Sequence, residues 1–281
     1  MRIDKNMTQK NTDIQRVDKA VLLTGGSSGI GEATALTLAK EGYIVYAASR
    51  SGKAPSNENI KALVLDVNDE ASLEKAVKDI ALKHGSLYAL ICNAGNGVAG
   101  AIDDTSLEEA RYQFETTYFG AVKTVKAGLK QFVSQGKGKI ITVSSVAGFI
   151  PIPYQAFYSS AKAALLILTK ALSIEVRKKG IQCCCVLPGD TKTDFTKSRR
   201  IALNAYSDAF GASMSKSLKK MEEDEINGMS PYKIAAAISK ELKKRKMRAT
   251  VTPGLQYKAI ESLSRFLPER LTLWLVARLY G

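Results

Sequence analysis

Residues 20–31 of the chain read Ala-Val-Leu-Leu-Thr-Gly-Gly-Ser-Ser-Gly-Ile-Gly. The run Ala20–Thr24 is apolar and is followed at once by glycine, which is typical of a buried strand. Three glycines are then spaced Gly-x-x-x-Gly-x-Gly, and residues 32–40 show a helical pattern that ends at Gly42. Such a turn lets the backbone amides of a helix start approach a phosphate group. The stretch therefore predicts a strand, an anion-binding turn and a helix.

Strand and helix patterns continue to alternate along the chain. Repeated strand–helix units of this length are typical of a doubly wound parallel sheet, whose ligands bind at the carboxyl ends of the strands. We therefore predict an α/β protein of the Rossmann type, with one domain and a C-terminal helical extension. The predicted strands after the first are 44–48, 62–65, 87–92, 139–143 and 181–187, and the predicted helices are 70–83, 107–135 and one beginning near Tyr158.

The chain has 281 residues, of which 45% are hydrophobic, so it can bury a large core. Two small domains are also allowed, but no linker or repeat divides the chain. We assign 1–18 to a polar extension, 19–255 to the sheet domain and 256–281 to the helical extension. The N-terminus lacks the apolar core of a secretory signal, and no uncharged run reaches the roughly 18 residues of a membrane span. The sequence predicts a soluble, cytoplasmic protein.

Cysteine and histidine are poorly placed for a metal site. Cys92, Cys183, Cys184 and Cys185 fall in strand patterns, and adjacent residues of a strand point to opposite faces. Buried thiols are therefore expected rather than a disulfide framework. The one histidine, His84, falls at the end of a predicted helix, where it suits a capping role. We predict no bound metal.

The formal net charge of +14 is concentrated toward the end of the chain, most densely at residues 240–248. Cations suit the C-terminal end of a helix, so a solvated helix end is the first interpretation. Nucleic acid, acidic lipid and an acidic carrier protein are alternatives, because a concentrated positive field attracts all three. Aromatic residues do not interleave the run, so we predict that the protein does not bind nucleic acid.

The second predicted strand ends in Ser49-Arg50. A dinucleotide-binding fold that prefers NAD places an acid near this point for the ribose hydroxyls. Here no acid is present, and the Arg50 guanidinium suits a 2'-phosphate. The sequence therefore favours NADP over NAD, although an exposed arginine without a role would leave the preference open.

Tyr158 and Lys162 lie four residues apart on one face of a predicted helix. An ammonium beside a phenol lowers the phenol pKa from its usual value of about 10, toward the range where a proton donor or acceptor works best. Ser145 follows a predicted strand and could hold a carbonyl oxygen at the same point. Taken alone, this Tyr-x-x-x-Lys spacing also occurs by chance on a solvated helix face.

Six motifs together resemble the short-chain dehydrogenase/reductase family, over roughly residues 18–195 and more loosely beyond. They are the glycine turn 24–31, Asp66-Val67, Asn93-Ala94-Gly95, Ser145, the Tyr158 to Lys162 motif and Pro188-Gly189, in this order. The resemblance implies a nucleotide-binding catalytic domain and hydride transfer between a carbonyl and a secondary alcohol.

The resemblance also implies individual roles. Ser145 would polarise the substrate oxygen, Tyr158 would move the proton, and Lys162 would hold the nicotinamide ribose and depress the Tyr158 pKa. The residues implied in cofactor binding, apart from Arg50, Tyr158 and Lys162, are Gly25, Ser27, Ser28, Gly29, Ile30 and Gly31 at the pyrophosphate, Asp66 and Val67 at the adenine, Asn93, Ala94 and Gly95 at the sheet centre, and Pro188, Gly189, Thr191 and Thr193 at the nicotinamide.

Thr117 stands where the family usually has an asparagine that helps a water-linked proton relay to the active-site lysine. A threonine hydroxyl still bonds a water, but it has fewer donors and a shorter reach. We therefore place Thr117 among the candidate catalytic residues, with a relay of reduced efficiency as the expectation.

The substrate is indicated only in outline. The loop 146–157 carries several apolar residues that suit a hydrophobic substrate, although they suit a plain core equally well, and 195–229 is long and basic like a lid. The tail from Pro253 is expected to cover the pocket, or else to form a subunit contact or a peripheral membrane contact.

We predict an NADP-dependent reductase of a hydrophobic ketone, of the steroid, bile-acid or lipid type. The alternatives are a 3-oxoacyl carrier-protein reductase, for which the basic last third would dock an acidic carrier, and a scaffold that binds NADP without turnover. Family members are commonly dimers or tetramers, so the resemblance also implies a homo-oligomer.

Overall fold

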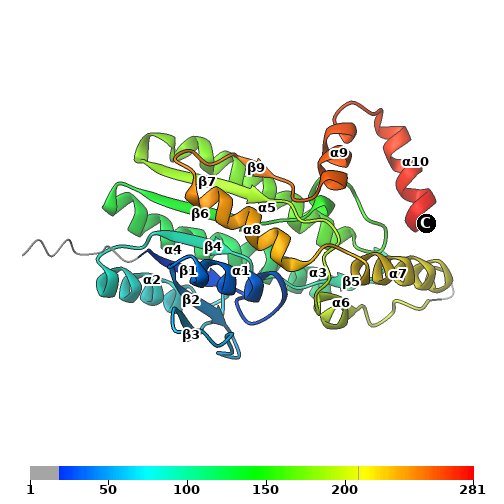
Figure 1. Ribbon diagram of the computed structural model, residues 1–281. Coiled ribbons are helices and arrows are strands. Elements are labelled where there is room, and N and C mark those ends of the chain that lie inside the picture. The colour runs from blue at the N-terminus through cyan, green and yellow to red at the C-terminus, as the bar shows by residue number, and fades with distance from the viewer. Residues whose placement is uncertain (1–18, 208) are drawn as a thin grey trace, which may run out of the picture.

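The computed structural model describes residues 19–207 and 209–281. At its centre is a seven-stranded parallel sheet in the order β3-β2-β1-β4-β6-β7-β9 (Figure 1). The chain runs outward in both directions from β1 and β4, so the predicted doubly wound fold is confirmed. The strands are β1 Ala20–Thr24, β2 Ile44–Ser49, β3 Ile60–Val64, β4 Ala89–Cys92, β6 Gly138–Val143, β7 Ile181–Val186 and β9 Thr250–Val251, with a separate pair formed by β5 Val98–Ala99 and β8 Arg200–Ile201.

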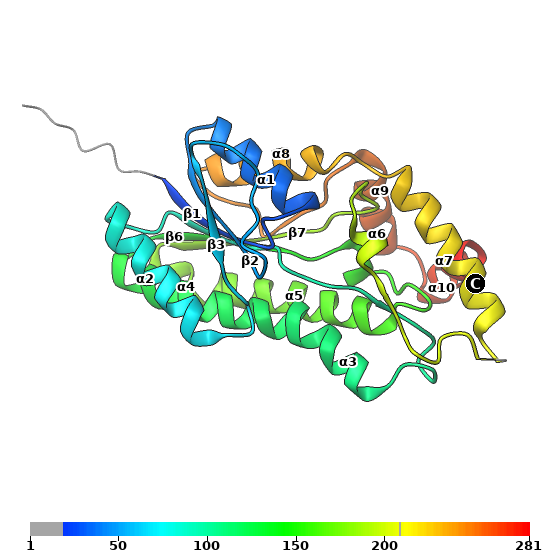
Figure 2. The ribbon, with the colours of Figure 1, turned by 90° about the horizontal axis from the view of Figure 1, so that it is seen from below.

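Helices cover both faces of the sheet (Figure 2). α1 and α8 pack against each other on one face, and α2, α4 and α5 lie on the other. Successive strand residues serve opposite cores, since Leu22 packs in one apolar cluster and Val21 in the other. The helices are α1 Gly29–Lys40, α2 Glu70–His84, α3 Leu107–Phe114, α4 Gly120–Gln135, α5 Ala156–Glu175, α6 Phe195–Ser198, α7 Gly211–Ile226, α8 Pro231–Lys243, α9 Leu255–Ser264 and α10 Glu269–Tyr280, with 3₁₀ turns Val146–Gly148 and Arg177–Lys179.

Local chemistry explains both ends of α2. The Asp69 carboxylate accepts a hydrogen bond from the Ser72 amide at the start of α2, and Gly85 ends that helix in the left-handed conformation. His84 is the last residue of α2 and lies within 2.9 Å of the Tyr46 hydroxyl. The helix predicted over 107–135 is interrupted by a π-helical segment, Glu115–Phe119, which the apolar spacing did not reveal.

The four cysteines are free thiols buried in strands, as expected. Helix α5 is long and apolar enough, by length and composition, to cross a membrane. From the sequence we found no uncharged run of that length, because Lys162 and Lys170 interrupt this helix. In the structure α5 packs against β7, and Lys162 is buried in the protein.

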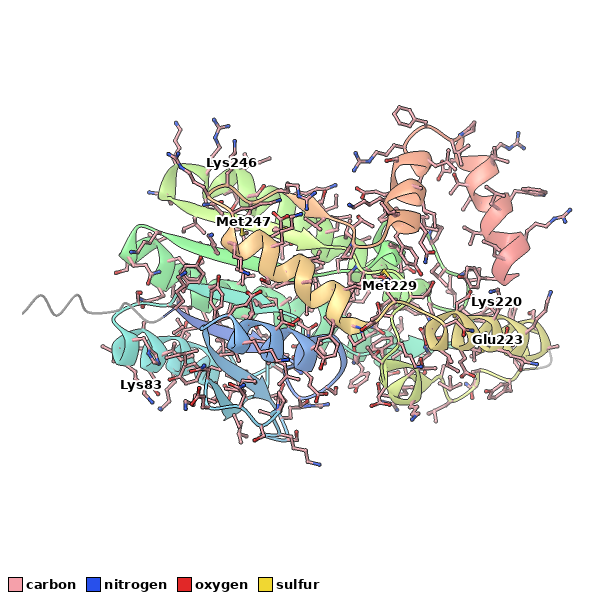
Figure 3. All side chains as sticks on the ribbon, viewed as in Figure 1. Lys83, Lys220, Glu223, Met229, Lys246 and Met247 are labelled. Atoms are coloured by element: carbon pink, nitrogen blue, oxygen red, sulfur yellow. The ribbon has the colours of Figure 1, made fainter. Side chains whose placement is uncertain are left out.

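The basic run 240–248 is organised around one buried carboxylate. Glu241 accepts hydrogen bonds from Lys244 at 2.6 Å and from the Arg248 guanidinium at 2.7 and 3.0 Å. Lys246 projects from the surface while Met247 is buried (Figure 3). This arrangement agrees with the first interpretation of the run as a helix end, because Lys244 and Arg248 bind a carboxylate in the last turn of α8.

The C-terminal helices α9 and α10 form a hairpin that rises from the end of the molecule carrying α7, and α10 returns to contact α7 (Figure 1). We call residues 255–281 the C-terminal hairpin. Strand β9, which leads into it, was not predicted, because two residues are too short to show a pattern. The polar extension assigned to 1–18 lies outside the described residues.

Candidate active site

A cavity of about 750 Å³ runs from the glycine turn, along the carboxyl ends of the strands, to the C-terminal hairpin. It is lined by all the candidate site residues named from the sequence except two, Gly31 and Thr117. The cavity therefore brings together segments that are distant in the chain, as expected at the carboxyl ends of a doubly wound sheet.

The glycine turn is held in shape by Asn93. Its side-chain amide donates to the carbonyls of Thr24 and Gly25, at 3.2 and 3.0 Å, and its backbone amide donates to the Thr24 hydroxyl. A Cβ atom on Gly31 would lie 1.9 Å from the Gly25 carbonyl oxygen, so only glycine fits there. Gly31 thus acts on the shape of the turn rather than lining the cavity, and Asn93 uses its donors on the turn.

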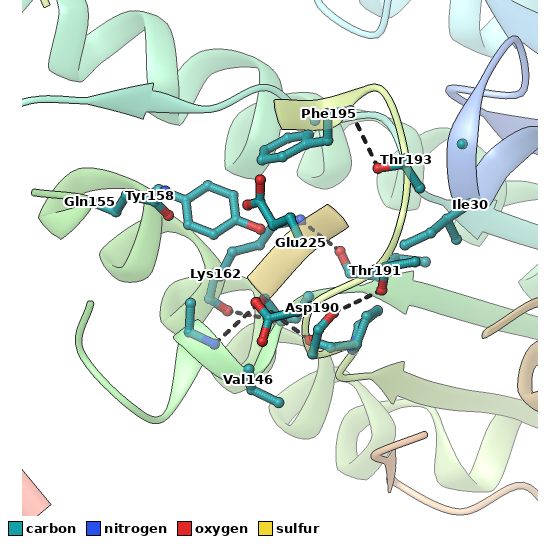
Figure 4. Close-up of a pocket in the computed structure, with 18 of the residues that line it drawn as sticks. Ile30, Val146, Gln155, Tyr158, Lys162, Asp190, Thr191, Thr193, Phe195 and Glu225 are labelled. Atoms are coloured by element: carbon teal, nitrogen blue, oxygen red, sulfur yellow. Dashed lines mark hydrogen bonds between the residues drawn. The ribbon is translucent and has the colours of Figure 1, made fainter. Parts of the chain in front are cut away.

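Tyr158 and Lys162 lie in the first turns of α5 (Figure 4). Ser145 lies two residues after the end of β6. The Lys162 ammonium donates to the Val143 carbonyl at 2.9 Å and lies 5.7 Å from the centre of the Tyr158 ring. Phe195 packs beside that ring, with the ring centres 5.8 Å apart. Three of the four predicted catalytic side chains, those of Ser145, Tyr158 and Lys162, therefore line the cavity.

The pKa values of this group differ from the expectation. Desolvation by the surrounding protein raises the pKa of Tyr158 to about 12. A hydrogen bond from Ser145 lowers this pKa, but by less than desolvation raises it. Burial lowers the pKa of Lys162 to about 8. From the sequence we expected the Lys162 charge to depress the Tyr158 pKa. In the structure desolvation is the larger influence, and it acts on the lysine as well.

Thr117 lies outside the cavity, within the π-helical segment, and is fully buried. Its hydroxyl donates to the Asn96 side-chain oxygen at 3.0 Å and accepts from the Gln113 amide at 2.9 Å. A Cβ atom on Gly95 would lie 3.7 Å from both the Thr117 hydroxyl and the Lys162 ammonium. The Thr117 hydroxyl and the Lys162 ammonium therefore both lie near Gly95, but the hydrogen bonds of Thr117 join it to Asn96 and Gln113.

Two acids line the cavity near Tyr158 that were not singled out from the sequence, Asp190 and Glu225. Burial raises the pKa of each carboxyl group, and both carboxylates raise the Tyr158 pKa, which means that their fields reach the phenol. Figure 4 shows Glu225 between the Tyr158 ring and Asp190. Glu225 lies in α7, which no sequence motif marks, whereas Asp190 directly follows the Pro188-Gly189 motif and could have been noticed.

The two acids have different partners. The Glu225 carboxylate binds the buried Arg199 guanidinium and the Thr196 hydroxyl. The Asp190 carboxylate accepts a hydrogen bond from the Tyr257 hydroxyl at 2.8 Å. The hydrogen-bond partner of the Asp190 carboxylate is thus a neutral group, whereas that of Glu225 includes a guanidinium.

The opposite wall of the cavity is apolar and comes largely from the C-terminal hairpin. The hairpin residues that line the cavity include Ile260, Leu263, Leu267, Leu275, Val276 and Leu279, and Ile150 and Ile152 of the loop before α5 line the same cavity. This agrees with the first of the three roles considered for the tail, a cover over the pocket. The cavity combines a polar catalytic end with an apolar body.

Comparison with known proteins places these features in a family. A family model for short chain dehydrogenases matches residues 19–204. A 3-ketodihydrosphingosine reductase of Bacteroides thetaiotaomicron is 38% identical over 266 residues, covering 93% of this chain and 97% of the relative. An NADPH-dependent 1-acyldihydroxyacetone phosphate reductase of Schizosaccharomyces pombe is 33% identical over 181 residues, covering 63% of this chain and 61% of that one.

Solved structures agree. A short-chain dehydrogenase from Streptomyces avermitilis superposes with a TM-score of 0.76 at 28% identity, covering 93% of this chain and 97% of that one. ElxO with NADP bound superposes with a TM-score of 0.71 at 26% identity, covering 86% and 99%. The tight glycine turn and the cavity beside it fit a nicotinamide dinucleotide. The chain therefore belongs to the short-chain dehydrogenase/reductase family and is an oxidoreductase acting on a CH–OH group.

Proposed function

We propose that this enzyme uses NADPH to reduce the ketone of a long-chain amino ketone of the sphingoid-base class. The observation that carries the proposal is the lining of the cavity, which combines the polar groups of Tyr158 and Asp190 with the apolar side chains of the C-terminal hairpin. The resemblance to a 3-ketodihydrosphingosine reductase over nearly the full length of both chains supports the same substrate class.

The side chains around Tyr158 suit reduction. With its pKa raised to about 12, the Tyr158 phenol stays protonated at neutral pH and can donate its proton to a carbonyl oxygen that is being reduced. Ser145 lies beside it and can donate a hydrogen bond to the same oxygen. When bound, the cofactor supplies the hydride. The charged form of Lys162 then favours the phenolate that remains on Tyr158.

The preference for NADPH rests on Arg50. This exposed residue follows β2 and lines the cavity together with Ser49 and Ser51. In the family fold this position faces the adenosine ribose, and a guanidinium there can pair with a 2'-phosphate. The absence of an acid at the end of β2 removes the group that NAD-preferring folds use for the free ribose hydroxyls.

Asp190 is the group that we assign to the amine of the substrate. A sphingoid 3-ketone carries an ammonium on the carbon beside the carbonyl, so a substrate oxygen near Tyr158 brings that cation to the acidic end of the cavity. Glu225 is already paired with Arg199, whereas within residues 19–207 and 209–281 the Asp190 carboxylate has a neutral partner, the Tyr257 hydroxyl, and no ion pair. A desolvated carboxylate gains most from a cation placed beside it.

The test is NADPH oxidation by the purified protein with 3-ketodihydrosphingosine, a long-chain 3-ketone without the amine, a ketosteroid, a keto bile acid and a 3-oxoacyl thioester, with NADH in parallel. We expect the amino ketone to have the highest kcat/KM and NADPH to be preferred. A preference for the steroid or the bile acid would contradict the substrate class. Turnover confined to the thioester would favour the carrier-protein alternative, and binding of NADPH with no turnover would favour the scaffold.

The homo-oligomeric state and the cytoplasmic location stay predictions. Sedimentation velocity of the purified protein tests the first, and fractionation of the producing cells tests the second.

A further inference from the structure

The C-terminal hairpin exposes large apolar side chains on the surface that faces away from the cavity. Phe266, in the turn between α9 and α10, is 85% exposed, and Trp274 in the middle of α10 is 52% exposed. Leu271 and Leu273 are also exposed, at 41% and 47%. None of these four side chains lines the cavity, so the substrate site does not account for them.

Helix α10 is apolar on more than one face. Thr272, Leu275, Val276 and Leu279 follow helical spacing and line the cavity. Leu271 and Trp274 lie on a different side of the same helix. A surface helix normally buries one apolar stripe and leaves its other faces polar, so the exposed leucines and tryptophan of α10 are not explained by the cavity alone. In Figures 1 and 2 the hairpin stands at one end of the molecule, where α10 contacts α7.

Cationic side chains surround the exposed apolar ones. Arg265 adjoins Phe266, Arg270 adjoins Leu271, and the Arg278 guanidinium lies 5.0 Å from the centre of the Trp274 ring. Arg265 pairs with Glu261, but within residues 19–207 and 209–281 we find no ion pair for Arg270 or Arg278. An aromatic side chain beside arginines, on a helix with exposed leucines, is typical of segments that bind in the interface of anionic membranes.

We propose that the outer face of the C-terminal hairpin, formed by Phe266, Leu271, Leu273 and Trp274 with Arg270 and Arg278, docks on the surface of an anionic lipid bilayer. The charges favour this occupant over a second copy of the chain. A symmetric contact through this face would bring the arginines of two copies together, and the cost of desolvating like charges opposes it. An anionic bilayer accepts both the aromatic side chains and the cations.

This docking would place the apolar wall of the cavity next to the bilayer, since the other faces of the hairpin helices form that wall. The docking itself needs no assumption about the substrate. Only the delivery of a lipid ketone from the bilayer into the cavity rests on the proposed function.

Trp274 is the only tryptophan in the chain, so its fluorescence reports directly on this face. The full-length protein is titrated with phosphatidylcholine vesicles, with and without phosphatidylglycerol, and with vesicles containing brominated lipid. We expect a blue shift of the emission and quenching by the brominated lipid, both stronger with phosphatidylglycerol and weakened by salt. No shift with either vesicle would overturn the proposal.

Two double variants locate the contact by co-sedimentation with the same vesicles. Phe266→Ser with Leu271→Ser should weaken binding by about tenfold or more, because it removes apolar area from the interface. Arg270→Gln with Arg278→Gln should abolish most of the advantage of phosphatidylglycerol. The matched control is Val64→Ser with Leu82→Ser, which changes two exposed apolar residues, 74% and 73% accessible, on β3 and α2. Equal loss of binding in the control would overturn the location.

Self-association is tested on the same samples. Sedimentation velocity of the wild type and the Phe266→Ser, Leu271→Ser variant is measured without lipid. We expect the same oligomeric state for both. A blue shift that grows with protein concentration in the absence of lipid, together with loss of an oligomer in the variant, would overturn the membrane proposal in favour of a contact between copies of the chain. NADPH binding by each variant verifies that the fold is intact.

Discussion

The hydroxyl of Tyr257, in α9, donates a 2.8 Å hydrogen bond to the carboxylate of Asp190, which lies just after β7 at the acidic end of the cavity. The same hydroxyl accepts a hydrogen bond from the Asp190 backbone amide at 3.0 Å. A Cβ atom on Gly189 would lie 2.1 Å from the Tyr257 ring, so the ring rests directly on the backbone of the Pro-Gly motif. The C-terminal hairpin is thereby joined to the catalytic part of the sheet.

Because Tyr257 donates to Asp190, a variant that keeps this hydrogen bond can test the charge of Asp190 apart from its structural role. The Asp190→Asn variant keeps an oxygen that accepts the Tyr257 hydrogen bond but loses the negative charge. We expect its kcat/KM for the amino ketone to fall by about ten- to a hundredfold, the usual loss when a charged hydrogen bond in a desolvated site is broken. The kcat/KM for the long-chain ketone without the amine should stay within about twofold, since that substrate has no cation to bind.

The two substrates serve as each other's control in steady-state assays of wild type and variant. Equal losses for both ketones would indicate that Asp190 acts only by holding Tyr257. If neither ketone is affected, the assignment of Asp190 to the amine is wrong. The wild-type assay with the amino ketone tests the proposed function separately.

The sequence predicted the framework of this site better than its polar details. The β1 strand and the glycine turn were located correctly, because an apolar run followed by closely spaced glycines has few other structures available. The π-helical segment at Thr117 could not be predicted, because a single wide turn between two α-helices is too short to show a pattern of its own. Glu225 could not be predicted either, since it reaches the cavity only through the packing of α7.

The pKa values of Tyr158 and Lys162 could not be predicted from the sequence either. Spacing places Tyr158 and Lys162 on one helix face, but spacing does not show how much protein surrounds them. In the structure burial dominates both groups, which reverses the direction predicted for the tyrosine. Desolvation depends on every neighbouring element, including α7 and the C-terminal hairpin, and so it follows from the fold rather than from a motif.

Tyr158→Phe tests the proton donor. The phenylalanine keeps the ring that packs on Phe195 but has no proton to give, so we expect kcat to fall by at least about a thousandfold, a typical contribution of general acid catalysis combined with positioning. Binding of NADPH, measured by fluorescence titration, should be little changed. Substantial remaining turnover would refute the assignment of Tyr158 as the donor.

The lowered pKa of Lys162 leads to two predictions about pH, in which activity and stability change in opposite directions. Reduction should decline as the pH rises through about 8, because the ammonium that stabilises the Tyr158 phenolate is then lost. The free energy of unfolding should instead increase with pH. The folded pKa lies below the unfolded value, so the unfolded chain binds more protons between about pH 8 and 10.5, and stability rises with pH in that window.

Replacing the lysine by a neutral side chain separates these effects. At pH 7 the Lys162→Met variant should be inactive yet more resistant to urea, by an amount on the order of 1–3 kcal/mol, because a desolvated charge has been removed. Urea titrations of both proteins at pH 7 and pH 10 make the comparison. The difference between them should shrink at the higher pH, and a loss of stability in the variant at pH 7 would show that the bond from Lys162 to Val143 outweighs the desolvation.

Arg50→Gln tests the cofactor preference. Loss of a guanidinium from the 2'-phosphate should raise the KM for NADPH by about tenfold or more, while the KM for NADH should remain within about twofold. The matched control is Lys53→Gln, which removes a nearby exposed cation that does not line the cavity. Similar effects on NADPH and NADH, or an equal effect in the control, would show that Arg50 contributes only to the general positive field.

The last prediction concerns Thr117, whose hydroxyl joins Asn96 to Gln113 in the fully buried π-helical segment behind Gly95. Thr117→Val keeps the shape of the side chain and removes the hydroxyl. Gln113 also donates to the Asn96 backbone and side-chain oxygens, at 3.0 and 3.1 Å, so the network loses one member and does not collapse. We expect a loss of about 1–3 kcal/mol in the free energy of unfolding, the cost of leaving buried polar groups short of a partner.

Thr117→Ser is the matched control, because it retains the hydroxyl. The comparison also decides whether Thr117 takes part in proton transfer. If its hydroxyl feeds a relay to Lys162, the valine variant should lose kcat more than tenfold at temperatures where it remains folded, and the serine variant should not. If the role is only structural, kcat of the folded valine variant should match the wild type. The geometry favours the second result, since the Thr117 hydroxyl bonds to Asn96 and Gln113, and neither residue lines the cavity.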